Sequence, residues 1–280
     1  MDHFNLAKPS FLLTPYIKHY WSIENTGKPD DQYVQRIIPS GMIEMIFYIY
    51  SRPRILDGCK DFSENVILSG HQKDFYDLQC NGNITVFSVV FRPEGLMKFF
   101  NIPLNELYNK NIPLKYLTGR FEQNIYSGIL DNVSFKKRVE IIENYLTCLL
   151  QANKNSFDFK RINHAVNIIR QSHGKISIET IASEVCLSRK QFERKFTEYV
   201  GATPKQYLKT IRLQLSLFLK SRNRTLSLTE LAFDCGYYDQ AHFINEFKFQ
   251  TGLTPKQYFD NNESYSDFFD DPTTVNPVNL

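Results

Sequence analysis

The sequence lacks the features of a membrane or secreted protein. Its most apolar run, Met42–Tyr50, has nine residues and contains Glu44, whereas a membrane-spanning helix needs about 20 apolar residues. The first ten residues, MDHFNLAKPS, show no basic segment followed by an apolar core, so no secretory signal is expected. We therefore expect a soluble protein of the cytoplasm that does not bind membranes.

Cysteine is scarce and is not arranged in pairs. The chain has five cysteines, an odd number, and none of them forms a C-x-x-C motif: Cys59, Cys80, Cys148, Cys186 and Cys235. This pattern argues against a disulfide framework and against a cysteine-based zinc site, and it is typical of a reducing compartment.

Motifs for catalysis and for cofactor binding are also missing. The sequence contains no G-x-S-x-G, P-loop or G-x-G-x-x-G segment, and its six histidines show no H-x-H or H-E-x-x-H spacing. No metal and no cofactor are therefore expected, and we expect a protein that is not an enzyme.

Charge is distributed unevenly along the 280 residues. Residues 156–260 hold 16 Lys and Arg against 10 Asp and Glu, whereas the net charge of the whole chain is only +3. The last twenty residues, 261–280, hold four acidic residues and no basic one, and we interpret them as an acidic, disordered tail. A basic region before that tail favours a polyanionic partner.

Residues 1–110 predict a β-rich domain. Short runs rich in Val, Ile, Phe and Tyr are separated by Pro and Gly, a pattern typical of antiparallel strands joined by turns. These runs are Tyr33–Ile38, Met42–Tyr50, Val66–Ser69 and Ile84–Phe91. We interpret them as a small sandwich or barrel, followed by two short helices at 94–100 and 104–108.

Residues 111–155 predict a helical linker. Its apolar residues are spaced 4, 3, 4 and 3 apart and form one stripe on a helix: Phe135, Val139, Ile142, Leu146 and Leu149. Two alternatives remain, because this stripe can pair two subunits in a dimer or pack on the β-rich domain of its own chain. The polar segment 151–156 ends the linker and marks the expected domain boundary.

A repeat of about fifty residues is the strongest signal. The segment Gly201–Tyr207, GATPKQY, recurs as Gly252–Tyr258, GLTPKQY, at an offset of 51. At the same offset upstream, Phe192 matches Phe243 and Phe196 matches Phe247. Two copies of one structural unit are the simplest explanation.

Each copy predicts a helix, a tight turn and a second helix. In the first copy, Ser188 is a plausible N-cap of the second helix, which buries Phe192 and Phe196 one turn apart. Gly201 ends that helix in a left-handed conformation, and Thr203 and Pro204 begin the next one. This is a helix-turn-helix arrangement, in which the second helix can enter a DNA major groove. A helix over 204–221, about 27 Å long, could hold two such recognition helices about one DNA turn apart.

Residues 160–260 resemble the DNA-binding domain of the AraC/XylS family of bacterial transcription regulators. The segment Ala232–Tyr258, AFDCGYYDQAHFINEFKFQTGLTPKQY, is close to the signature of that family. Three segments of the β-rich region more loosely resemble the cupin-like companion domains of such regulators: Tyr20-Trp21, Ile38–Gly41 and Phe91–Leu96. The expected fold is therefore α+β with two domains. The first is a cupin-like barrel or sandwich (1–110), which is followed by the helical linker. The second is an all-α domain (156–260) of two helix-turn-helix units joined by a long helix.

One residue departs from the family pattern. The first turn has Cys186 where the family usually has Gly, as Gly236 provides in the second turn. If this position needs a positive φ, a residue with a Cβ costs about 1 kcal/mol or more.

Candidate DNA contacts lie on the faces opposite the buried phenylalanines. On the first recognition helix, the candidates for base edges are Arg189, Lys190, Glu193 and Arg194. On the second, they are Gln240, Ala241, Ile244 and Asn245. The candidates for phosphate are Lys205 and Lys256, near capped helix starts, and His242, for which packing is an equal alternative. For all of them the alternative is a solvated polar face.

The resemblance implies a sequence-specific transcription regulator that binds double-stranded DNA at two adjacent major-groove segments. It leaves room for a small-molecule effector, a homodimer and a contact with RNA polymerase. Four residues could line an effector pocket, although such groups more often pair or face solvent: Trp21, Glu44, His71 and Arg92. Two other functions stay open, a cupin-type enzyme with an accessory helical domain and a sequence-neutral DNA-packaging protein.

Overall fold

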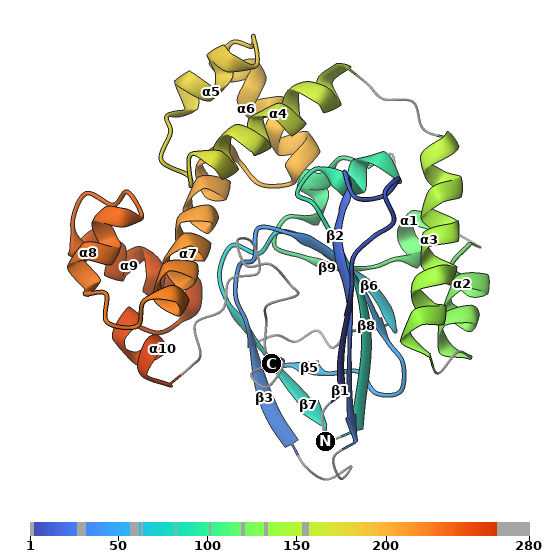
Figure 1. Ribbon diagram of the computed structural model, residues 1–280. Coiled ribbons are helices and arrows are strands. Elements are labelled where there is room, and N and C mark those ends of the chain that lie inside the picture. Colours follow the sequence, from blue (N-terminus) through green and yellow to red (C-terminus); the bar gives the residue numbers. More distant parts are fainter. Residues whose placement is uncertain are drawn as a thin grey trace.

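The computed structural model describes residues 3–26, 32–56, 62, 64–81, 83–100, 102–118, 121–131, 134–152 and 157–261. A β-rich part is flanked on one side by two helices and is joined on another to a helical part (Figure 1). The expected α+β fold with a β-rich N-terminal region and an all-α C-terminal region is confirmed. Residues 153–156 of the predicted boundary, and 262–280 of the predicted tail, lie outside the described residues.

The larger sheet has six antiparallel strands in the order β1-β2-β8-β4-β6-β9. Their bounds are His3–Ala7, Ile17–Thr26, Asn83–Phe91, Ile43–Tyr48, Val66–Ser69 and Asn111–Pro113 in that order. Three of the four runs predicted from the sequence correspond to β4, β6 and β8 of this sheet, and the fourth, Tyr33–Ile38, corresponds to a strand of the smaller sheet. Strands β1, β2 and β9 of this sheet were not predicted, nor were two strands of the smaller one.

The smaller sheet has three antiparallel strands in the order β3-β7-β5. These are Gln32–Ile37, Tyr76–Asn81 and Arg54–Ile55. Leu78 and Cys80 of β7 pack in one core with Ile67 of β6 and Val86 of β8. The two sheets therefore form a sandwich, and the described strands do not close into a barrel.

The other face of the six-stranded sheet is covered by α2 (Phe121–Leu130) and α3 (Phe135–Ala152). Ile142 and Leu146 of α3 are fully buried in a core with Phe47 and Phe87 of the sheet. Of the two alternatives for the apolar stripe, the structure shows packing within the chain. Arg138, beside the stripe, is also buried, and its guanidinium pairs with Glu24 of β2 at 3.1 Å.

Three short helices follow β8 and connect the sheet to α2. They are η1 (Gly95–Lys98), η2 (Leu104–Leu107) and α1 (Lys115–Thr118). The first two are 3₁₀ helices and correspond to the short helices predicted at 94–100 and 104–108.

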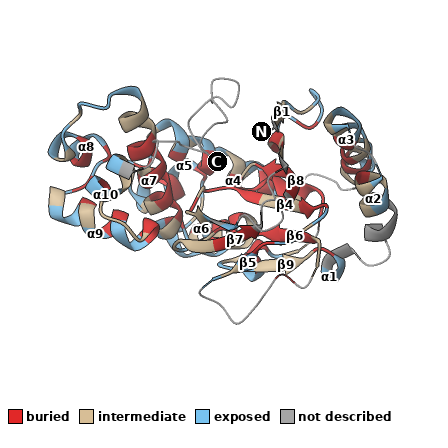
Figure 2. Ribbon diagram, turned by 90° about the horizontal axis from the view of Figure 1, so that it is seen from below, coloured by how far each residue is buried: buried red, intermediate tan, exposed pale blue. Residues whose placement is uncertain are grey.

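The helical part consists of two units of three helices. The first has α4 (Phe157–Gln171), α5 (Ile178–Glu184) and α6 (Arg189–Val200). The second has α7 (Pro204–Arg222), α8 (Leu228–Asp234) and α9 (Gln240–Thr251), and α10 (Pro255–Asn261) follows. Buried residues run through the six-stranded sheet and along α7 (Figure 2). No described helix has the length and apolar character needed to cross a lipid bilayer.

Each unit has a core built on a pair of phenylalanines. The rings of Phe192 and Phe196 lie 5.3 Å apart, and those of Phe243 and Phe247 lie 5.6 Å apart. All four side chains are fully buried. The repeat in the sequence therefore corresponds to a repeat in packing, as the offset of 51 predicts.

The predicted caps are present at both copies. Ser188 and Thr203 form capping boxes with Gln191 and Gln206. Gly201 and Gly252 end α6 and α9 in the left-handed region, with φ of 92° and 77°. The start and end of each recognition helix are thus fixed by residues next to it in the chain.

In the turn of the first unit, Cys186 adopts the positive φ for which the family usually has glycine. Cys186 has a φ of 54°, and its counterpart Gly236 has a φ of 77°. A side chain with a Cβ therefore occupies a left-handed position in the first unit, which is strained by about 1 kcal/mol.

Ile142→Glu is expected to lower the free energy of unfolding by about 3 kcal/mol or more, because it places a carboxylate in the core beneath α3. Urea denaturation of the full chain measures the change. Asn144→Glu, at an exposed position of the same helix, is the control and should shift it by less than about 0.5 kcal/mol. A variant that keeps its stability and loses self-association would instead identify the stripe as a subunit interface.

Cys186→Gly is expected to raise the free energy of unfolding by about 0.5–1 kcal/mol, because glycine adopts a positive φ without strain. Gly236→Ala should lower it, since the new Cβ would lie 3.0 Å from Cγ of Lys175 at a φ of 77°. Thermal unfolding of both variants compares the two turns. Loss of stability in Cys186→Gly would contradict this account of the turn.

Candidate nucleic-acid interface

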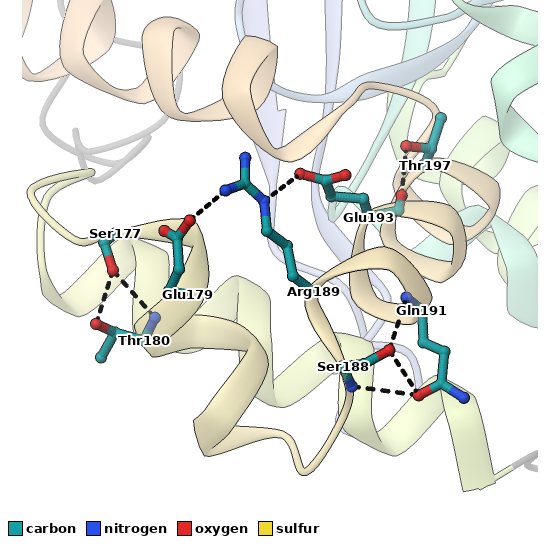
Figure 3. Close-up of polar contacts among 8 residues, drawn as sticks. All are labelled: Ser177, Glu179, Thr180, Ser188, Arg189, Gln191, Glu193 and Thr197. Carbon is teal, nitrogen blue, oxygen red and sulfur yellow. Dashed lines mark hydrogen bonds and ion pairs between the residues drawn. The ribbon is translucent and has the colours of Figure 1, made fainter.

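The start of α6 is held in place by local hydrogen bonds (Figure 3). The Ser188 hydroxyl accepts from the Gln191 amide at 3.3 Å, and the Gln191 side chain accepts from the Ser188 amide at 3.2 Å. On α5, the Ser177 hydroxyl accepts from the Thr180 amide at 3.0 Å. The two helices of this unit thus have fixed starts, which positions the first turn of α6.

Two of the four predicted base-reading residues on α6 pair with each other. Nε of Arg189 donates to Glu193 at 3.0 Å, and its other nitrogen Nη1 pairs with Glu179 of α5 (Figure 3). The hydrogen bond to Glu193, and then the charge of Glu179, raise the pKa of Arg189 above its ordinary value. Because all three side chains are well exposed, these pairs are weak and can exchange for contacts to DNA.

Lys190 and Arg194 are the other two exposed cations of this face, and neither has an ion-pair partner among the residues that the structure describes. They border a cleft of about 580 Å³ between α6 and η2. Its remaining lining residues are Pro103, Asn105, Glu193, Thr197 and Glu198. The face of α6 that carries the candidate DNA contacts therefore lies beside a segment of the β-rich part.

The face of α9 is mostly polar but carries less charge. Ala241 and Asn245 are exposed, and Gln240 is partly buried and accepts a hydrogen bond from Thr229 of α8 at 2.8 Å. Ile244 packs partly against the core of its unit. Asp239 caps α9 by accepting from the His242 amide at 2.7 Å, so the first turn is again fixed locally.

Each recognition helix is joined to the first helix of its unit by an ion pair at an equivalent position. Lys195 of α6 pairs with Asp158 of α4. Glu246 of α9 pairs with Lys209 of α7 at 2.9 Å, and also with Arg212 at 3.1 Å. Positions 158 and 195 become 209 and 246 at the offset of 51, and the signs of the charges are reversed. Burial would raise the pKa of Glu246, but its two cationic partners outweigh it and lower that pKa below its ordinary value.

The three phosphate candidates lie at the surface. Lys205 and Lys256 are exposed near the starts of α7 and α10. The His242 side chain is half exposed, with its ring edge-on to Tyr237 at 5.3 Å and Nε2 3.7 Å from Glu246. Both alternatives for His242, packing and an outward contact, therefore fit its position.

Two further residues extend the candidate faces. Thr197 lines the cleft beside Lys190 and Arg194, and Lys248 is exposed at the matching position of α9. Lys248 was not predicted, although the offset of 51 from Thr197 pointed to it. Tyr238, 87% exposed, stands just before the N-cap of α9.

The structure gives separate partners to the four residues proposed for an effector pocket. Trp21 stacks on Phe4 with ring centres 6.4 Å apart, and Glu44 accepts from Ser88 at 2.8 Å. His71 is buried against the helical part, and burial lowers its pKa to about 4.

The fourth residue, Arg92, donates through Nε to the Thr14 carbonyl at 2.9 Å. None of the four borders the cleft at α6. The effector-pocket interpretation therefore stays a prediction. No group of three or more His, Cys, Asp or Glu side chains in the described part of the chain is arranged to hold a metal ion.

Comparison with family models divides the chain into two matched regions. Residues 181–261 match a family described as a helix-turn-helix domain. Residues 6–113 match a family described as a domain of unknown function, DUF6597. The two matches correspond to the helical part and to the β-rich part.

Several transcription regulators are similar in sequence. An uncharacterised HTH-type transcriptional regulator of Haemophilus influenzae is 35% identical over 100 residues, which cover 35% of this chain and 33% of that protein. The HTH-type transcriptional activator RhaS of Escherichia fergusonii is 31% identical over 110 residues, which cover 39% and 38% of the two chains. The chain thus spans little more than a third of the length of these relatives.

Two further similarities extend over most of the chain. The uncharacterised HTH-type transcriptional regulator YidL of Escherichia coli is 24% identical over 221 residues, covering 77% of this chain and 71% of that protein. The crystal structure of ToxT from Vibrio cholerae matches with 13% identity and a TM-score of 0.46, covering 92% of this chain and 97% of that one.

The sequence signature, the two helix-turn-helix units and the matching family model agree. Residues 181–261 belong to the AraC-type family of helix-turn-helix domains, joined in one chain to a DUF6597 domain.

Proposed function

We propose that the protein is a cytoplasmic, sequence-specific DNA-binding transcription regulator. Its two helix-turn-helix units, within residues 156–260, contact two adjacent major-groove segments of double-stranded DNA. Residues 1–110 and the linker 111–155 form the regulatory part, which responds to a small molecule or to association with another chain. Any contact with RNA polymerase belongs to the same proposal.

The observation that carries the proposal is the pair of exposed polar faces on two units that share one long helix. Helix α7 has 19 residues and is therefore about 28 Å long. It belongs to the cores of both units. One turn of B-DNA is about 34 Å, so recognition helices at the two ends of α7 suit successive turns of one DNA face.

The polar composition of the two faces favours reading of bases over neutral packaging. Lys190 and Arg194 are suited to guanine, and Asn245 is suited to adenine. All three are exposed. A packaging protein relies on cations alone, whereas α9 presents Asn245, Ala241 and Gln240 where cations would be expected. The AraC-type domain and the relatives that share it also favour regulation of transcription over catalysis.

The first test is the shape of the DNA site. DNA selected from a random pool by the full chain should be protected at two major-groove segments about 10–10.5 base pairs apart on one face of the duplex. Hydroxyl-radical footprinting measures this protection. One protected segment per chain would argue against two reading units, and failure to select any sequence would refute sequence-specific binding.

The second test separates reading from positioning. Arg194→Ala should weaken binding to the selected site by about 1–3 kcal/mol and relax the preference at one or two bases, because Arg194 lies on the reading face. Lys205→Ala should weaken binding to all sequences alike and lower the slope of affinity against salt by about one. Fluorescence anisotropy measures the affinity for each DNA sequence, and repeating it at several salt concentrations gives the slope of affinity against salt.

Lys160→Ala, at an exposed position of α4 and outside both recognition helices, is the matched control for loss of a positive charge. If Arg194→Ala and Lys205→Ala reduced affinity uniformly across sequences, Arg194 would have no role in reading bases.

A further inference from the structure

The β-rich part contacts the two helix-turn-helix units at equivalent points. Val200 and Thr251 are the last residues of α6 and α9, and they are related by the offset of 51. The Thr251 carbonyl accepts a hydrogen bond from Nη1 of Arg36 at 3.3 Å. His71 is buried against the first unit, where its ring lies edge-on to Tyr207 of α7. A side chain of the β-rich part therefore contacts each of the two units.

The glycines that follow Val200 and Thr251 lie directly against the β-rich part. A Cβ built on Gly201 would stand 2.8 Å from the carbonyl oxygen of Leu104 in η2. A Cβ built on Gly252 would stand 2.6 Å from the Phe75 ring. At Gly201 the obstacle is backbone, so this position needs glycine for the contact as well as for the positive φ; at Gly252 the obstacles are side-chain atoms of Phe75 and Arg36, which a Cβ would displace.

The two side chains, His71 and Arg36, are themselves held in place. His71 is 3% exposed, and its ring lies edge-on to Tyr207 of α7 with centres 5.7 Å apart. Arg36 donates to both oxygens of Asp77, at 2.8 and 2.7 Å, and its guanidinium lies 4.4 Å above the centre of the Phe75 ring. A donor fixed in this way holds the helix end at one position.

Chemistry favours Arg36 at the end of a helix. The last carbonyls of a helix lack a partner within the helix and carry partial negative charge. The Arg36 guanidinium satisfies the Thr251 carbonyl at the end of α9. Because this acceptor is a backbone atom, the contact does not depend on the residue type at position 251.

A third contact lies between these two points. Gln214, in the middle of α7 and fully buried, donates to the Pro39 carbonyl at 2.7 Å. Apolar packing accompanies the hydrogen bonds, since Met42 and Val90 belong to the core of the first unit and Ile38 packs on the core of the second. The helical part is thus in contact with the β-rich part in both of its units and at the middle of α7.

We propose that the β-rich part fixes the spacing and mutual orientation of the two recognition helices, with His71 and Arg36 as positioning residues and Phe75 as the support of Arg36. This inference rests on the function proposed above. Long helices curve, so α7 on its own lets the two units move relative to each other, and the attachment at both helix ends removes that freedom.

DNA is sensitive to this geometry. One added base pair lengthens the path between two segments by about 3.4 Å and turns it by about 34°. Two recognition helices held at fixed positions therefore fit one spacing between the segments, whereas two loosely joined units tolerate neighbouring spacings.

The experiment measures how strongly the full chain prefers one spacing. Affinities are compared for the selected site and for the same site with one base pair added or removed between its two segments. We expect the wild-type chain to lose affinity by about tenfold or more on either change. In Phe75→Ala and in His71→Leu that loss should shrink to about threefold or less, since one recognition helix is then free to adjust.

Two control variants separate positioning from general destabilisation. His71→Phe keeps an aromatic ring against Tyr207 of α7 and should retain the wild-type preference. Tyr50→Ala removes an aromatic ring that is 68% exposed on the β-rich part and should also retain it. Partial unfolding lowers the active fraction equally for every spacing, so it leaves the ratio of affinities unchanged. Phe75 is only partly buried, so its truncation is the safer of the two test variants.

The outcomes of the experiment are distinct. The inference is overturned if Phe75→Ala and His71→Leu fold and keep the wild-type ratio of affinities for the selected and the altered spacings. It is also overturned if the wild-type chain binds its selected site with no preference for spacing. Both results leave the proposed function intact. A wild-type chain that selects no DNA sequence overturns the proposed function instead.

Discussion

Helix α7 has to be covered on nearly every side, and the arrangement of the helical part depends on this. Tyr207, Leu208 and Ile211 belong to the core of the first unit, whereas Leu213, Leu215 and Leu217 belong to the core of the second. A helix with apolar residues all round is stable in water only when it is enclosed. The two units enclose it from two sides, and the β-rich part reaches it through Gln214.

This constraint explains why the recognition helices can present polar faces. Each recognition helix packs on α7 through its buried pair of phenylalanines. The remaining face of each helix is available for contacts outside the chain. The first turn of each helix is fixed by a cap, and most of the candidate DNA contacts on the two helices are exposed.

The features that follow from neighbouring residues could be predicted from the sequence. Capping boxes at Ser188 and Thr203, and left-handed ends at Gly201 and Gly252, involve residues within a few positions of each other. For this reason the two units and their repeat were predicted with nearly correct bounds. The helix over Phe135–Ala152 was also predicted, but its periodicity fits a dimer seam and a core equally well.

The features that depend on distant parts of the chain could not be predicted. Strand β2 lies between β1 and β8 and buries His19 and Ser22, so its polar residues hide the alternation that marks a strand. The cleft between η2 and α6 brings Asn105 beside Arg194, and no local pattern indicates this contact. Likewise, nothing near His71 in the sequence connects it to Tyr207 of α7.

The reversed ion pairs of the two units have a consequence for folding. Tandem copies of one unit can misassemble, with a helix of one copy docking on the other. If α6 docked on α7 at the site that α9 occupies, Lys195 would face Lys209, and if α9 docked on α4 at the site of α6, Glu246 would face Asp158. Like charges would meet in both mispaired forms, whereas opposite charges meet in the native one. The reversal thus discriminates against exchange between the copies while leaving the shared backbone of the two units unchanged.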